Sequence, residues 1–177
     1  MEQVLTDILC TRCGLCCDGS LFADVELSGR AEATRVEAMG LEIDEDSDRP
    51  LLVLPCGALR GTRCGIYAHR PRCCRTFECR LLQDVRRGTV AVEQALDLIA
   101  DARAKIGRVQ ALLPKAGEQG RLPLGERVAE VLAVEADANP ETERRHAELE
   151  AAMSDVEEAI RRSFLGAGRA ARVRGSI

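Results

Sequence analysis

Two clusters of cysteine are the residues best suited to chemistry in this sequence. The first is the stretch CTRCGLCC, which places four cysteines within residues 10–17. A disulfide needs two thiols, so four thiols this close together require another explanation. The second cluster lies in the stretch PCGALRGTRCGIYAHRPRCCRTFEC of residues 55–79. Together the clusters hold all nine cysteines, which are Cys10, Cys13, Cys16, Cys17, Cys56, Cys64, Cys73, Cys74 and Cys79.

The spacing of the first cluster is typical of metal ligands. A C-x-x-C step lets two thiolates reach one metal, and C-x-x-C-x-x-C adds a third. Ferredoxin-type loops continue with a fourth cysteine and a proline, whereas this sequence has Ser20 at that position and no proline after it. We therefore expect the missing ligand to come from the second cluster.

The adjacent pair Cys16 and Cys17 adds a further constraint. Side chains of neighbouring residues tend to point apart, so the two thiols are hard to place on one metal without strain. The pair therefore predicts either two neighbouring metal sites or one multinuclear site, shared by the two clusters.

Cysteine usage also bears on the compartment. No apolar run is long enough to span a membrane, and the acidic stretch MEQVLTDILC lacks the features of a signal peptide. We therefore expect a cytoplasmic protein, because thiols stay reduced there and dense cysteines more often bind metal than form disulfides. An odd number of cysteines also argues against a closed disulfide framework.

The elements between the clusters are expected to be short. Residues 21–27 alternate apolar and polar side chains, which predicts a half-buried strand. Ser28 is expected to cap a helix over 29–39. An acidic turn over 41–50 and a second short strand over 51–54 follow.

After the second cluster the pattern becomes helical. Apolar residues at helical spacing predict a helix that Thr89 caps and Pro114 ends. A loop and a short helix over 124–136 follow, and Asn139 is expected to cap the last helix. That helix carries an apolar stripe of Leu149, Met153, Val156, Ile160 and Phe164. The stripe is too short for a sustained heptad array, so we expect it to pack on the preceding helices rather than form a homodimer seam.

These elements predict a mainly α fold with a little β. Aromatic residues make up only 2% of the chain, and two of the four lie in the second cluster. That region should therefore have a small core and depend on bound metal for stability. We expect a small cysteine-rich, metal-stabilised domain over residues 1–88, a helical extension over 89–165 and a flexible basic tail over 166–177.

The two clusters together resemble the bacterial CxxCxxCC family, also called YkgJ-type, of zinc- or iron-chelating domains. The family pattern is similar to C-x-x-C-G-x-C-C with a later C-x-I-Y-x-x-R-P-x-x-C-R-x-F-x-C, and the resemblance runs from Cys10 to Cys79. It places Cys73 on a variable position. Carried over residue by residue, it implies the metal ligands Cys10, Cys13, Cys16, Cys17, Cys56, Cys64, Cys74 and Cys79.

The resemblance implies metal chelation, with iron-sulfur binding known for relatives that include a flagellin lysine methylase. Eight candidate thiolates with no well-placed histidine favour an iron-sulfur cluster over Zn, although zinc sites of four cysteines meet the same criterion. Arg70 and Pro71 are expected to fix the turn that presents Cys74, with Arg70 bonding backbone carbonyls or a thiolate sulfur. The arginines of residues 60–80 are also expected to offset thiolate charge rather than bind nucleic acid.

Three functional classes stay open at this point. We favour a metal-binding protein without turnover, in which iron-sulfur or zinc sites organise the fold and the C-terminal helices contact a protein partner. The alternatives are an iron-sulfur or metal-dependent enzyme, redox or protein-modifying, and a metal chelator or trafficking protein. The sequence has no Ser-His-Asp set, phosphate loop or carboxylate-histidine motif, so it identifies no catalytic residue.

Overall fold

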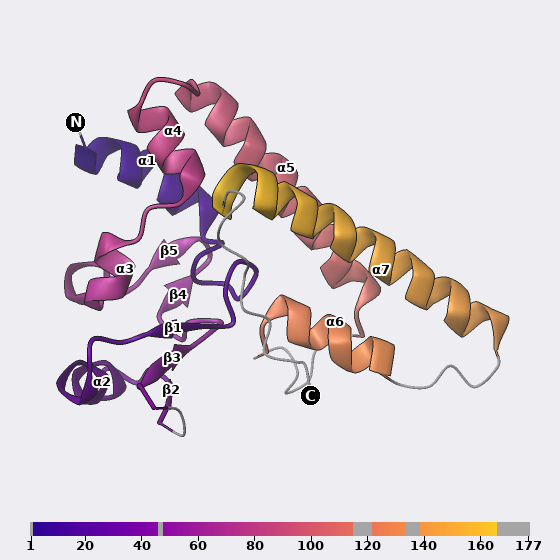
Figure 1. Ribbon diagram of the computed structural model, residues 1–177, viewed down its shortest axis with the longest axis horizontal. Coiled ribbons are helices and arrows are strands. Elements are labelled where there is room, and N and C mark those ends of the chain that lie inside the picture. The colour runs from indigo at the N-terminus through magenta and orange to yellow at the C-terminus, as the bar shows by residue number, and fades with distance from the viewer. Residues whose placement is uncertain (1, 46–47, 115–121, 134–138, 166–177) are drawn as a thin grey trace.

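The computed structural model describes residues 2–45, 48–114, 122–133 and 139–165 (Figure 1). The predicted tail over 166–177 lies outside this range, as does the end of the helix predicted over 124–136. The described chain is mainly helical with two small sheets, so the predicted fold class is confirmed.

Helices form the larger part of the structure. They are α1 Glu2–Cys13, α2 Arg30–Glu37, the 3-10 turn η1 Tyr67–His69, α3 Arg72–Thr76, α4 Arg80–Arg86, α5 Val92–Leu112, α6 Leu124–Ala133, α7 Pro140–Ile160 and the π-helical turn η3 Arg161–Leu165. The strands are β1 Asp24–Glu26, β2 Ile43–Asp44, β3 Leu51–Val53, β4 Leu59–Arg60 and β5 Arg63–Cys64.

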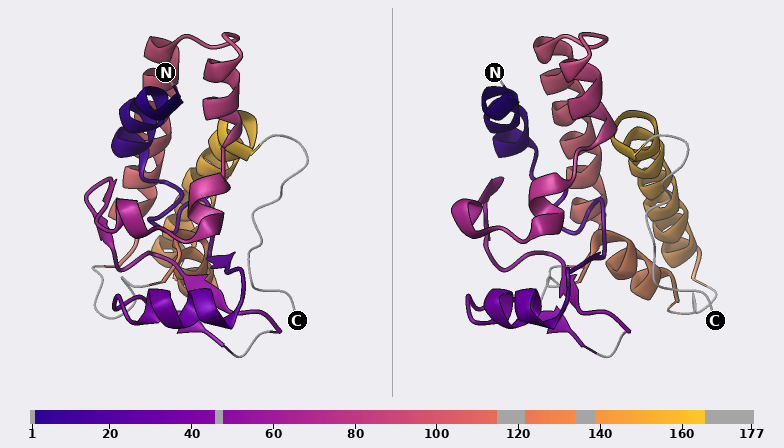
Figure 2. Two further views of the ribbon diagram at one scale, coloured as in Figure 1. Left: turned by 90° about the vertical axis from the view of Figure 1, so that its left-hand side faces the viewer. Right: turned by 60° about the vertical axis from the view of Figure 1, so that its left-hand side comes forward.

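The strands form two separate antiparallel sheets. β3 is the centre of a three-stranded sheet, in which Leu52 pairs with Val25 of β1 and with Ile43 of β2. β4 and β5 form a hairpin in which Leu59 pairs with Cys64. In Figure 2 the three-stranded sheet and α2 lie at the opposite end of the molecule from α1, α4 and the start of α5.

The long helices α5 and α7 lie side by side and form the helical part of the molecule (Figure 1). One face of α5 is buried through Ala95, Ile99, Ala102, Ile106 and Val109. The facing side of α7 buries Leu149, Ala152, Val156 and Ile160, and Phe164 of η3 continues it. The prediction that the apolar stripe of the last helix packs on the preceding helices is therefore confirmed.

Two hydrophobic cores support the helical part and the three-stranded sheet. The first joins residues of α1 and the following loop to α4, α5, α6, α7 and η3, so it crosses the predicted boundary after residue 88. The second, smaller core lies between α2 and the three-stranded sheet and is formed by Leu27, Ala33, Val36, Leu41, Leu52 and Ala58. The cysteine-rich segments contact both cores, which places them at the junction of the two parts.

Helix ends show where local sequence signals held and where they failed. Asn139 caps α7 by accepting a hydrogen bond from the Glu141 N–H at 3.0 Å, as predicted. The predicted caps Ser28 and Thr89 are wrong. The N-cap of α2 is Gly29, one residue later than predicted. Thr89 donates its hydroxyl to the carbonyl of Asp84, and α5 begins three residues further on.

Within the described residues, none of the helices combines the length and the apolar character needed to cross a bilayer.

Packing between α5 and α7 predicts the effect of a truncation in the larger core. Leu149 is only 2% exposed, so Leu149→Ala should lower the free energy of unfolding by about 2–5 kcal/mol through lost burial and the cavity left behind. Denaturant unfolding followed by circular dichroism measures this change. Glu150→Ala alters the next, exposed residue and should stay within about 0.5 kcal/mol of wild type. Equal effects of the two changes would contradict the assignment of Leu149 to the core.

Candidate metal centre

A tight turn after α1 gathers the first cysteine cluster. Cys10 and Cys13 lie on the last turn of the helix, which ends because Gly14 adopts a left-handed φ of 75°. A Cβ at this position would lie 3.1 Å from the Cα of Thr62, so both the conformation and the space favour glycine. The Cys17 N–H then donates to the Gly14 carbonyl at 2.9 Å. The chain thereby folds back, and all four cysteines gather at one end of α1.

Backbone hydrogen bonds join the second cluster to this turn. The Cys56 N–H donates to the carbonyl of Cys17 at 2.8 Å. The Thr62 hydroxyl donates to the carbonyl of Thr11 in α1. Thr62 lies in the turn between β4 and β5, and β5 carries Cys64. Both contacts bring cysteines that are far apart in sequence to the same place.

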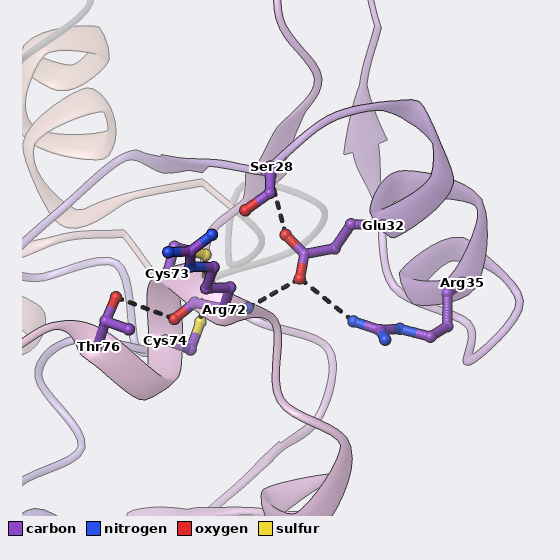
Figure 3. A network of polar contacts seen from close by, with 7 residues as sticks. All are labelled: Ser28, Glu32, Arg35, Arg72, Cys73, Cys74 and Thr76. Carbon is purple, nitrogen blue, oxygen red and sulfur yellow. Dashed lines mark hydrogen bonds and ion pairs between the residues drawn. The ribbon is translucent and has the colours of Figure 1, made fainter.

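Helix α3, which carries the adjacent cysteines of the second cluster, is held at its start by a carboxylate of α2. Glu32 accepts the backbone N–H groups of Ser28 and Arg72, each at 2.8 Å, and pairs with Arg35 at 3.2 Å (Figure 3). Burial acts to raise the pKa of Glu32, but these N–H donors and the guanidinium outweigh it and hold the pKa below its usual range. The carboxylate therefore stays charged and fixes α3 against α2.

Two residues of the motif CRTFEC have clear local roles. Cys79 is the N-cap of α4, and its sulfur accepts the Leu82 N–H at 3.5 Å. The ring of Phe77 meets that of Phe22 edge to face, with centroids 5.2 Å apart. This ring pair ties the segment before α4 to the loop that follows the first cluster.

The thiols separate into two groups of four. In the first, burial and the neighbouring thiol of Cys79 raise the pKa of Cys10 to about 11. Burial raises the pKa of Cys13 to about 12, and Cys79 and Cys10 act in the same direction. Burial also raises the pKa of Cys16, followed by the effects of Cys79, Cys13, the adjacent Cys17 and Cys10. The first group is therefore Cys10, Cys13, Cys16 and Cys79.

The second group forms around Cys17. Burial raises the pKa of Cys17 to about 12, with Cys56 and Cys64 as the next causes. The pKa of Cys74 is raised by its hydrogen bond with Cys73, then by burial, and also by Cys17 and Cys56. The second group is therefore Cys17, Cys56, Cys64 and Cys74.

Packing separates five of these eight thiols in the same way. Cys13 is part of the larger core, and Cys16 and Cys79 lie against it. Cys56 and Cys74 lie against the smaller core beside the sheet. Packing thus places Cys16 with the first group, and the effects of Cys56 and Cys64 place Cys17 with the second, in keeping with the side-chain argument from the sequence.

Cys73 stands at the edge of the second group. Its sulfur lies 3.9 Å from that of Cys74, and this hydrogen bond is the main reason why the pKa of Cys73 is lowered. The negative charge of Glu32 acts in the opposite direction and raises the pKa of Cys73. All nine cysteines are free thiols.

Arginine side chains lie near both groups. After burial and neighbouring thiols have raised the pKa of Cys10, Arg70 and Arg86 partly offset the rise. Arg70 acts in the same way on Cys17 of the other group. The sequence had predicted that arginines of residues 60–80 offset thiolate charge, and the position of Arg70 fits this role.

The helical part of the molecule also contacts the cysteine turn, which the sequence did not predict. Arg103 of α5 donates to the carbonyl of Cys13 at 2.8 Å. The Leu124 N–H at the start of α6 donates to the carbonyl of Gly19 at 3.0 Å. Gly19 has a φ of 78°, and a Cβ there would lie 3.1 Å from the Cα of Pro123. No pattern in the sequence pairs these residues, because the contacts arise from packing alone.

The donor set fits a thiophilic metal. Each group offers four soft sulfur ligands in a largely buried setting, which suits zinc or iron-sulfur coordination. The raised pKa values of Cys10, Cys13 and Cys17 favour protonated thiols, and a metal bound by these cysteines would displace the protons. Within the described ranges, no three His, Cys, Asp or Glu side chains already stand close enough together to hold a metal ion.

A comparison with family models identifies this part of the chain. The CxxCxxCC model, described as "Putative zinc- or iron-chelating domain", matches residues 9–95. The match includes all nine cysteines and ends near the start of α5, so most of α5 and all of α6 and α7 lie beyond it. No curated protein and no solved structure matches the chain. Over residues 9–95, the chain is therefore similar to the CxxCxxCC family of zinc- or iron-chelating domains.

Proposed function

We propose that this protein binds two neighbouring metal centres, one on each group of four cysteines. The observation that carries the proposal is the division of the thiols, in which the adjacent Cys16 and Cys17 belong to different groups. Four thiolates complete the coordination of a structural zinc ion or of one iron-sulfur cluster. Metal binding would displace the thiol protons and draw the sulfurs of each group closer together.

The role that follows is organisation of the fold without turnover. A centre with four protein ligands keeps no open position for a substrate, unlike a catalytic zinc site. The first centre would join α1 to the start of α4, and the second would join the turn after α1 to the β4–β5 hairpin and to α3. Bound metal would thus hold together short elements that bury few apolar side chains. The long C-terminal helices would then serve as the contact surface for a protein partner.

Iron-sulfur clusters are the metal centres that we favour, with zinc as the alternative. The groups contain only sulfur donors, which both options accept. Such a cluster needs a reducing compartment, and nine free thiols fit the cytoplasm.

The two-centre proposal predicts that each group loses its metal independently. Cys13→Ser should abolish the first centre and Cys64→Ser the second, because three thiolates and a hydroxyl bind soft metals poorly. Each variant should keep about half of the wild-type metal, and the double variant should keep none. Metal content is measured by elemental analysis after anaerobic purification.

The same series distinguishes one shared site from two. Complete metal loss in either single variant would indicate one multinuclear site that needs both groups. Full metal content in either variant would remove that cysteine from the set of ligands.

Cys73 and Cys74 provide a matched pair of adjacent thiols. Cys74 lies near Cys17 and Cys56, whereas Cys73 lies at the edge of the group. Cys74→Ser should therefore lose the second centre and the stability coupled to it, while Cys73→Ser should keep metal content and melting temperature near wild type. Elemental analysis and thermal unfolding measure both. The reverse result would exchange the two residues in the ligand set.

Metal identity can be tested directly. Protein expressed and purified without oxygen should be brown, with acid-labile sulfide in proportion to iron. The visible spectrum and a sulfide assay measure this, and the Cys13→Ser, Cys64→Ser double variant is the colourless control. Colourless wild-type protein with stoichiometric zinc would instead identify both centres as zinc-thiolate sites.

A further inference from the structure

Arg70 is held in a fixed orientation by an aromatic ring. It directly follows η1, and its guanidinium carbon lies 3.8 Å from the centroid of the Tyr67 ring. The Tyr67 hydroxyl donates to the carboxylate of Asp7 in α1 at 3.3 Å, which fixes the ring. The ring therefore covers one face of the guanidinium. Because the N–H donors of a guanidinium lie in its plane, the stacking also fixes the directions in which they point.

The Nε of Arg70 is buried and has no hydrogen-bond acceptor. A buried donor without a partner is costly, and in a native protein it calls for an explanation such as a functional role or a bound ion. The surrounding chain supplies a stacked ring for this guanidinium, yet it supplies no acceptor for that nitrogen. An acceptor for Nε would therefore come from a group that gains charge when the protein is loaded.

The thiol groups are suitable candidates because Arg70 lies close enough to each for its charge to act on one of its thiols. Its positive charge favours the thiolate form of Cys10 in the first group and of Cys17 in the second. Four thiolates carry more negative charge than the divalent ion or cluster that they bind, so each loaded centre is anionic. Two anionic centres close together repel each other unless a cation lies near both.

We propose that Arg70 is a counter-cation shared by both metal centres, whose guanidinium N–H groups donate to thiolate sulfurs of each. This inference rests on the proposed function. Arginine suits the position because it carries its charge permanently and presents several donors in one plane, and stacking on Tyr67 fixes that plane. A lysine would supply the charge but not the planar set of donors. Arg70 is thus a positioning and charge-balancing residue rather than a ligand.

The experiment measures metal release from each centre separately. Arg70→Gln, Arg70→Lys and the exposed control Arg75→Gln are each combined with Cys13→Ser and with Cys64→Ser, so that one centre remains. Release of bound metal into excess EDTA is followed under anaerobic conditions. Arg70→Gln should speed release about 10-fold or more in both backgrounds, because it removes charge-assisted hydrogen bonds to the sulfurs. Arg70→Lys should release metal at a rate between those of Arg70→Gln and of the single-cysteine parent. Arg75→Gln should release metal at the rate of that parent.

Several outcomes would overturn the shared role. If Arg70 only fixes the turn that presents Cys74, release should speed up in the Cys13→Ser background alone, and Arg70→Lys and Arg70→Gln should be equally fast. Release at the Arg75→Gln rate in both backgrounds would remove any role for Arg70 at the centres. If Arg70→Gln does not fold, Arg70→Lys alone decides, since it too should be faster than the control in both backgrounds. Wild-type protein without metal would instead contradict the proposed function.

Discussion

The arrangement of the cysteine region depends on one geometric constraint, which is that adjacent side chains cannot easily serve the same centre. Cys16 and Cys17 follow a left-handed glycine turn, and the thiols that act most strongly on their pKa values differ, being Cys79 for Cys16 and Cys56 for Cys17. Cys16 belongs with the cysteines at the end of α1 and the start of α4. Cys17 belongs with Cys56 and with the cysteines of the β4–β5 hairpin and α3. The short turn that Gly14 permits therefore stands where both groups of thiols meet.

This constraint also explains why the molecule has two cores. The larger core ends at the first thiol group and the smaller core ends at the second, so each group closes one edge of a hydrophobic cluster. Within the described ranges, the smaller core has six buried members, and none is aromatic. A core of this size contributes little stability by itself, because hydrophobic free energy scales with buried apolar area. Sulfur ligands at its edge would supply the missing connections through metal rather than through larger side chains.

The sequence predicted the chemistry of the site better than its surroundings. Cysteine spacing alone predicted a metal site shared by the two clusters and the separation of Cys16 from Cys17. The set of eight expected ligands, and Cys73 as the spare thiol, came from the family resemblance and stay predictions. The long helices were also predictable, because their apolar faces repeat over many turns. Helix α1 and the short helices α3 and α4 were missed, since a few turns with cysteines and arginines give no clear periodicity. The caps of α2 and α5 were wrong because backbone geometry and tertiary contacts outweighed the local preference of serine and threonine.

What the sequence could not predict is how the region outside the family match acts on the cysteine turn. Arg103 of α5 binds the Cys13 carbonyl, and the start of α6 binds the carbonyl of Gly19. Both contacts are to backbone, so they restrain the path of the turn without competing for its sulfurs. A rigid turn fixes where the first thiols stand before metal arrives, which lowers the entropy lost on binding. The helical part is therefore more than an appended module, because it shapes the loop from which both thiol groups begin.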